Sequence, residues 1–227
     1  VLRTLRRRTD SCRLTPGREN MDWLQLRRML GIGLPAGIQN TLYSVTNLFV
    51  QKAINYLGSD TVAAWSAYWK LDGIFWPVSS AIGITVMTFV GQNYGAHRRE
   101  RIYKSIRIGV LMHMAFSLLY AAGLYFAREP VLRLFCTDEN VLRQGCEVVD
   151  YIVLGYLTVF STEIFSSAMR GTGNSVVPTV LTLFGVCILR LVLLFTVTFP
   201  HLSDWTVALC YPATWATTSV LFLIYYK

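Results

Sequence analysis

The sequence predicts an all-α polytopic membrane protein, and three observations lead to that class. Of the 227 residues, 53% are hydrophobic and only 15% are charged, whereas an ordinary soluble domain carries roughly a quarter charged residues. The apolar residues gather in runs of about 20 or more, and each run can cross a ~30 Å hydrocarbon core as a helix. The runs do not alternate between apolar and polar residues, as the strands of a transmembrane β-barrel would.

Two regions are expected along the chain. Residues 1–28 are rich in arginine and lack the apolar core of a secretory signal peptide, so we expect a basic cytoplasmic segment. Its end, residues 22–30, is predicted to form a short amphipathic helix at the membrane interface. Residues 29–227 are predicted to form one domain of six transmembrane helices. The expected spans are 31–57, 61–91, 106–127, 147–169, 176–199 and 204–226.

The charges between the spans predict the orientation. Basic residues dominate before the first span and in the loop after the second, which contains Arg98, Arg99, Arg101, Lys104 and Arg107. The loops of the other side mix cations with acidic residues. By the positive-inside rule, we expect a multi-pass protein of the cell membrane with both termini in the cytoplasm. Topology and contact with anionic headgroups account for the net charge of +8. No nucleic acid is expected as a partner, because basic and aromatic residues do not interleave.

Signatures of catalysis are missing from the sequence. His97, His113 and His201 are far apart and do not have the spacing of metal ligands. There is no nucleophile elbow, phosphate-binding Walker loop or dinucleotide fingerprint. We therefore expect neither an enzyme nor a bound metal or cofactor.

The charged residues at membrane depth are the functional candidates, because polar groups are costly there. Glu163 lies seven residues before Arg170, about 10 Å from the end of the fourth span. A carboxyl in this position can take up a proton or bind a cation, so we assign ion or proton coupling to Glu163 and Asp72. The alternative is a hydrogen-bonded Glu163 that only bridges helices. We expect a structural ion pair for Arg190, and Asp72 is a geometrically possible partner because the two lie at similar depths.

Other polar and aromatic residues of the first two spans are candidates for lining a substrate cavity. Tyr68 and Trp65 offer cation–π contacts to flat cationic molecules, although anchoring at the membrane interface is an alternative role. Lys70 points about 200° away from Asp72 around a helix, so it faces a different neighbour. The candidates are Gln39, Asn40, Tyr43, Asn47, Trp65, Tyr68 and Lys70.

Four segments carry a family resemblance. They read GLPAGIQN (33–40), AINYLGSDTVAA (53–64), TFVGQNYGA (88–96) and AMRGTGNSVVPT (168–179). In order and spacing they resemble the C-terminal six-helix half of the multidrug and toxic compound extrusion (MATE) family. The bacterial type carries a Glu seven residues before its RGxG motif, which here is Glu163. It also carries charged residues where Lys70 and Asp72 stand. Some relatives have a carboxylate on the first helix of this half, where this chain has none.

The resemblance implies one lobe of a two-lobed transporter with a central cavity that opens alternately to either side. Such transporters export cationic, amphipathic compounds in exchange for sodium ions or protons. Only one lobe is present in this sequence, so the resemblance also implies a missing N-terminal lobe or a second copy as partner. Two alternatives stay open. One is a related flippase for lipid-linked oligosaccharides, and the other is a truncated membrane lobe that transports nothing.

Overall fold

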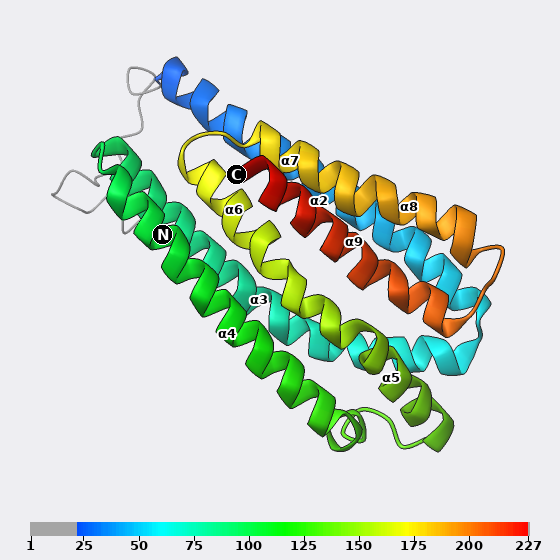
Figure 1. The fold of residues 1–227 in the computed structure, drawn as a ribbon. Coiled ribbons are helices and arrows are strands. Elements are labelled where there is room, and N and C mark those ends of the chain that lie inside the picture. The colour runs from blue at the N-terminus through cyan, green and yellow to red at the C-terminus, as the bar shows by residue number, and fades with distance from the viewer. Residues whose placement is uncertain (1–21, 227) are drawn as a thin grey trace, which may run out of the picture.

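The computed structural model describes residues 22–226, and these residues form a bundle of long helices (Figure 1). The α-helices are α2 (Trp23–Tyr56), α3 (Ser59–Gly95), α4 (Arg99–Leu132), α5 (Glu139–Ile152), α6 (Val159–Gly171), α7 (Val176–Thr182), α8 (Leu189–Leu193) and α9 (Asp204–Tyr226). Shorter segments connect some of them. These are the 3₁₀-helix η2 (Val153–Thr158) and the π-helical segments η3 (Leu183–Ile188) and η4 (Leu194–Thr198).

These elements combine into six rods within the described range. The α5–η2–α6 elements follow one another without a break, as do α7, η3, α8 and η4. Five rods are long and apolar enough to cross a membrane, namely all except α2. The rod of α2 is 34 residues long, but it carries the polar residues Gln39, Asn40, Asn47 and Gln51. The all-α membrane fold predicted from the apolar runs is confirmed.

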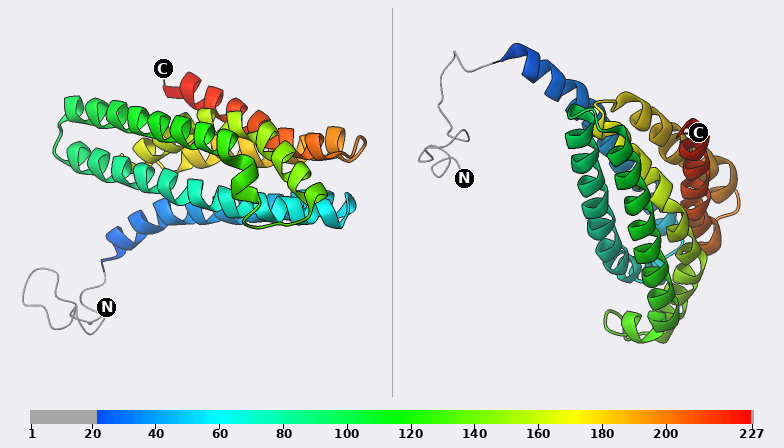
Figure 2. Two further views of the ribbon diagram at one scale, coloured as in Figure 1. Left: turned by 90° about the horizontal axis from the view of Figure 1, so that it is seen from below. Right: turned by 60° about the vertical axis from the view of Figure 1, so that its left-hand side comes forward.

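The first rod differs from the expected one at its start. Asp22 caps α2, because its Oδ1 accepts a hydrogen bond of 2.8 Å from the backbone N–H of Leu24. The helix then continues without interruption to Tyr56, so residues 22–30 are the first turns of α2 and not a separate helix. These turns extend beyond the rest of the bundle (Figure 2), and Trp23 is exposed there. The rest of the basic segment, residues 1–21, lies outside the described residues.

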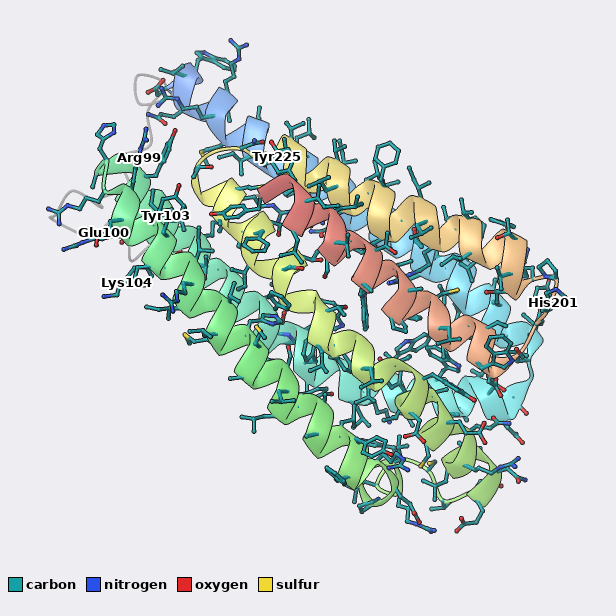
Figure 3. The ribbon with its side chains drawn as sticks, in the orientation of Figure 1. Arg99, Glu100, Tyr103, Lys104, His201 and Tyr225 are labelled. Atoms are coloured by element: carbon teal, nitrogen blue, oxygen red, sulfur yellow. The ribbon has the colours of Figure 1, made fainter. Side chains whose placement is uncertain are left out.

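The two ends of the bundle carry different charges. Figure 3 shows Arg99, Lys104 and Tyr225 at one end and His201 at the other. Ion pairs gather toward the His201 end. There Arg133 Nη1 lies 2.9 Å from Glu139 Oε1.

Aromatic side chains fill the core where α3, α4, η2 and α9 meet. Phe75 of α3 is completely buried, and its ring centroid lies 4.4 Å from that of Tyr156 and 5.3 Å from that of Phe116. The opposite face of α4 exposes large apolar side chains, among them Leu119 and Phe126. Such a surface fits contact with lipid, since lipid tails do not penalise apolar exposure as water does.

Candidate functional site

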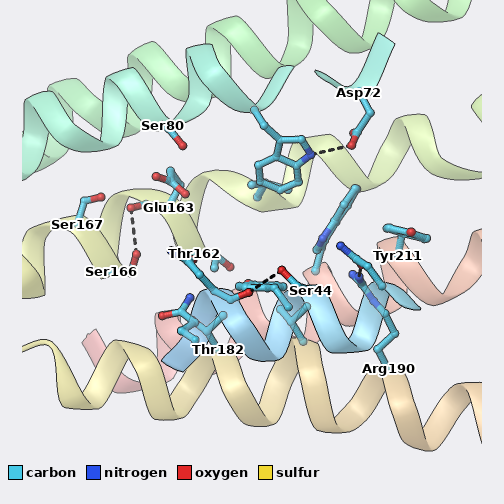
Figure 4. A pocket seen from close by; sticks show the side chains of 18 of the residues that line it. Ser44, Asp72, Ser80, Thr162, Glu163, Ser166, Ser167, Thr182, Arg190 and Tyr211 are labelled. Carbon is cyan, nitrogen blue, oxygen red and sulfur yellow. Dashed lines mark hydrogen bonds between the residues drawn. The ribbon is translucent and has the colours of Figure 1, made fainter. Parts of the chain in front are cut away.

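A cavity of about 840 Å³ lies between α2, α3, α6, α8 and α9 (Figure 4). Its volume is within the range of ligand-binding cavities, which is roughly 300–1,000 Å³. Both candidate carboxylates and Arg190 line it. Its polar and aromatic lining includes Gln39, Asn40, Tyr43, Asn47, Trp69, Asp72, Trp76, Thr162, Glu163, Ser167, Arg170, Arg190, Tyr211 and Trp215.

Glu163 presents its carboxyl to this cavity from α6 (Figure 4). Across the helix interface is Gly83 of α3, where an added Cβ would lie 3.2 Å from Glu163 Cδ and 2.8 Å from Ser167 Oγ. The side chain is half-buried. Over residues 22–226, no hydrogen-bond donor or cation is within bonding distance of the carboxyl. Glu163 therefore combines a protein wall on one side with an open polar cavity on the other.

Asp72 of α3 is held by aromatic donors instead. Its Oδ1 accepts hydrogen bonds from Tyr156 Oη at 2.6 Å and from Tyr68 Oη at 3.3 Å. Its Oδ2 accepts one from Trp76 Nε1 at 2.9 Å (Figure 4). Tyr156 comes from the 3₁₀ segment η2. The two carboxylates of the cavity thus differ, because Asp72 is fixed by three donors and Glu163 by none among the described residues.

Arg190 of α8 is 3% exposed and does not make the ion pair predicted for it. Its Nη2 donates to Thr214 Oγ1 at 3.1 Å and its Nη1 to Asn47 Oδ1 at 3.5 Å. The guanidinium lies over the ring of Tyr211, 4.3 Å from its centroid. In the described part of the chain, no carboxylate oxygen lies within 4.0 Å of it. The predicted pair with Asp72 is wrong, because no nitrogen of Arg190 lies within 4.0 Å of an Asp72 oxygen and each side chain is hydrogen-bonded to other partners.

The four polar candidates of the first span share one face of α2 and line the cavity. Tyr43 lies three and four residues after Asn40 and Gln39, and Asn47 lies four after Tyr43, and positions with such spacings share one side of a helix. Gln39 also joins helices, because its Oε1 accepts hydrogen bonds from Arg170 Nη2 at 2.7 Å and Thr179 Oγ1 at 3.4 Å. The residues are Gln39, Asn40, Tyr43 and Asn47.

Three other candidates do not line the cavity, so their prediction is wrong. Lys70 points away from Asp72 to an exposed position, where its Nζ lies 4.9 Å from the ring centroid of Phe135. Trp65 and Tyr68 share a face with Asp72 but lie nearer the end of the bundle that carries His201. Other aromatic side chains of the core pack against them there. Trp65 is completely buried, and Tyr68 is 1% exposed with its hydroxyl 2.8 Å from that of Tyr156.

Several residues of the site were not identified from the sequence. Trp76 lies four residues after Asp72, so helical spacing could have revealed it. Tyr156 is 84 residues from Asp72 in the chain, and Gly83 faces Glu163 from another helix. No local pattern marks such pairs, because they meet only through packing.

The family assignment follows from a family model. The model described as MatE matches residues 35–196, a range that contains the cavity residues of α2, α3, α6 and α8. The chain belongs to the MatE family. This confirms the resemblance to MATE transporters drawn from the four segments.

Similar proteins and solved structures agree with this assignment. The probable multidrug resistance protein YoeA of Bacillus subtilis is 26% identical over 208 residues, which are 91% of this chain and 45% of that protein. A crystal structure of MATE in complex with MaD5 matches with a TM-score of 0.83 at 14% identity, over 96% of this chain and 48% of that one. The Vibrio cholerae MATE transporter VcmN in its bent form matches with a TM-score of 0.82 at 16% identity, over 92% and 48%.

The lengths of these relatives can be compared with that of the MatE chain. It spans about half the length of the relatives it matches. The structural matches show that its fold is that of half a MATE transporter. The family and the apolar helices together identify a multi-pass membrane protein.

Proposed function

We propose that this MatE chain is one lobe of a secondary transporter that exports cationic amphipathic compounds in exchange for sodium ions or protons. The observation that carries the proposal is the Glu163 carboxyl, which faces a cavity of about 840 Å³ without a cation bound to it among the described residues. The name of the Bacillus subtilis relative, a probable multidrug resistance protein, supports the export of drugs.

Exchange follows from the chemistry of one carboxylate. Glu163 cannot favourably hold a substrate cation and a coupling ion at the same time, so binding of a proton or sodium ion releases the substrate. The aromatic side chains of the same cavity, Trp76, Tyr211 and Trp215, offer apolar surface and cation–π contacts to a flat cationic compound. Asp72 supplies a second negative charge in a fixed position.

A second lobe completes this mechanism. A single lobe forms one wall of a cavity, whereas alternating access needs two units that rock against each other around the site. We propose that an N-terminal lobe or a second copy of this chain covers the cavity. A tag at the C-terminus of the chromosomal gene would show which, because a membrane immunoblot separates a product of about twice this length from one of this length.

The proposed setting is the cell membrane, with the end of the bundle that holds Arg99 and Lys104 in the cytoplasm (Figure 3). The flippase alternative requires a cationic cavity for a pyrophosphate. Two carboxylates, Asp72 and Glu163, stand in this cavity beside Arg170 and Arg190, so no observation favours the flippase.

Substitution of Glu163 by Gln tests the proposal. The variant keeps the size of the side chain and removes its charge, so we expect ethidium efflux from cells to be abolished while the amount of protein in the membrane stays unchanged. Glu100→Gln changes an exposed carboxylate in the first turn of α4; it is the matched control and should transport normally. Efflux that survives in Glu163→Gln would remove Glu163 from the mechanism. Proteoliposomes with an imposed sodium or proton gradient would identify the coupling ion.

A further inference from the structure

Arg190 is a buried cation that the proposed exchange does not use. Its side chain is 3% exposed, and burying a guanidinium is costly unless an anion or a full set of acceptors compensates. The contacts that hold it are neutral, namely Thr214, Asn47 and the ring of Tyr211. They orient the guanidinium but do not cancel its charge.

The hydrogen bonds of Arg190 are also incomplete. A guanidinium has five N–H donors, and in the described structure Nη1 and Nη2 each donate to one acceptor. Nε is buried, and no acceptor among residues 22–226 is within hydrogen-bond distance of it. The planar fork of an arginine suits a carboxylate or phosphate, which can accept two of these N–H groups at once.

Arg190 lines the same cavity as the two carboxylates, and the three groups come from different helices (Figure 4). Glu163 stands on α6, Asp72 on α3 and Arg190 on α8. Asp72 makes no direct ion pair with Arg190, and its oxygens accept hydrogen bonds from Tyr156 and Trp76 instead. Arg170 of α6 lines it as well, so the wall of the cavity presents two positive and two negative charges to whatever enters it.

We propose that Arg190 binds an anionic oxygen group of the transported compound, a carboxylate or a phosphate, so that zwitterionic amphiphiles are the preferred substrates. The cationic group of such a compound pairs with Glu163 or Asp72, and its anionic group pairs with the fork of Arg190. This inference rests on the proposed export function and narrows its substrate class. The competing arrangement is a carboxylate of the second lobe that pairs with Arg190 and leaves no subsite.

Two dyes with one difference between them provide the test. Rhodamine 123 is the methyl ester of rhodamine 110, so the two share a cationic ring system and differ in whether the carboxyl is free. The native protein, together with any second lobe that it has in the membrane, is solubilised and purified in detergent. Dye binding is then measured by fluorescence polarisation. We expect the wild type to bind rhodamine 110 about tenfold more tightly than its ester, because hydrogen bonds to charged groups have this order of magnitude.

Arg190→Gln removes the charge and the fork. We expect it to weaken rhodamine 110 binding by about 10- to 100-fold, while binding of the ester changes by less than about twofold. Arg190→Lys keeps the charge without the fork and should give an intermediate loss for rhodamine 110 only. Arg143→Gln, an exposed arginine of α5, is the control for removal of a positive charge and should bind both dyes as the wild type does.

Each contrary result has its own meaning. If Arg190→Gln weakens both dyes equally, Arg190 pairs with a carboxylate of the protein and the inference is overturned. If Arg190→Gln fails to fold, the dye preference of the wild type and the binding by Arg190→Lys still test the inference. A wild type that binds the ester more tightly than rhodamine 110 overturns the inference. A wild type that binds neither dye would contradict the proposed function itself. Binding of the ester alone contradicts only the subsite at Arg190.

Discussion

Gly83 of α3 makes room for the carboxyl of Glu163 on α6. A Cβ at position 83 would lie 3.2 Å from Glu163 Cδ and 2.8 Å from Ser167 Oγ, and closest of all to Glu163 Oε1. In Gly83→Ala the carboxyl must therefore move or α3 and α6 must separate, since packed interiors tolerate added methyl groups poorly. We expect ethidium efflux to fall by about tenfold or more, the loss that a displaced reacting group causes.

Gly123→Ala is the control for this substitution. Position 123 is a helical glycine of α4 with nothing within 4 Å of an added Cβ. Alanine there should leave efflux unchanged and stabilise the helix slightly. Normal efflux by Gly83→Ala at normal protein levels would show that the position of the Glu163 carboxyl does not matter for transport.

The hydroxyl of Tyr156 makes the shortest of the three hydrogen bonds to Asp72, at 2.6 Å. Tyr156→Phe removes it and leaves the ring in place, so the carboxylate keeps only Tyr68 and Trp76. Loss of a hydrogen bond to a charged group costs about 1.5–3 kcal/mol, and we expect the midpoint of thermal unfolding in detergent to fall by a few degrees. Tyr225→Phe, which alters an exposed tyrosine, should not change the midpoint, and an equal drop in both variants would contradict a specific role for Tyr156.

Much of the fold was accessible from the sequence, because runs of apolar residues report the bilayer directly. The predicted last span, 204–226, coincides with α9 (Asp204–Tyr226). The fourth is the α5–η2–α6 rod, which starts earlier, at Glu139. That start was missed because α5 is amphipathic, with polar residues such as Arg143 and Gln144 between its buried ones. A run of apolar residues marks the part of a helix that contacts lipid, so it does not reveal turns of the same helix that are amphipathic.

The candidate site was predictable only in part. A charge inside an apolar run is visible in one dimension, and Glu163, Asp72 and Arg190 all line the cavity. The partner of each charge depends on packing between helices that are far apart in the chain. For that reason the sequence pointed to an Asp72–Arg190 pair, whereas Asp72 is bonded to Tyr156 and Arg190 to Thr214.

Gly155 in η2 packs tightly against α9. A Cβ there would lie 2.8 Å from the Trp215 ring and 2.9 Å from Pro212 Cβ. Gly155→Ala should destabilise the protein by about 1–3 kcal/mol, because the rigid ring of Pro212 and the indole cannot both yield. Unfolding in a mixed-detergent titration measures this. Gly95→Ala, which meets nothing within 4 Å, is the control, and equal stability of the two variants would show that α9 shifts freely.

The charge difference between the ends of the bundle predicts its orientation in the membrane. Lys104 and His201 are exposed at opposite ends (Figure 3). The basic end should remain in the cytoplasm, because positively charged loops are retained there. In a background with the native cysteines replaced, a membrane-impermeant maleimide should label His201→Cys in intact cells and Lys104→Cys only after permeabilisation. The cysteine-free protein controls for background labelling. The reverse pattern would place the arginine-rich loop outside the cell, and the direction proposed for export would then be wrong.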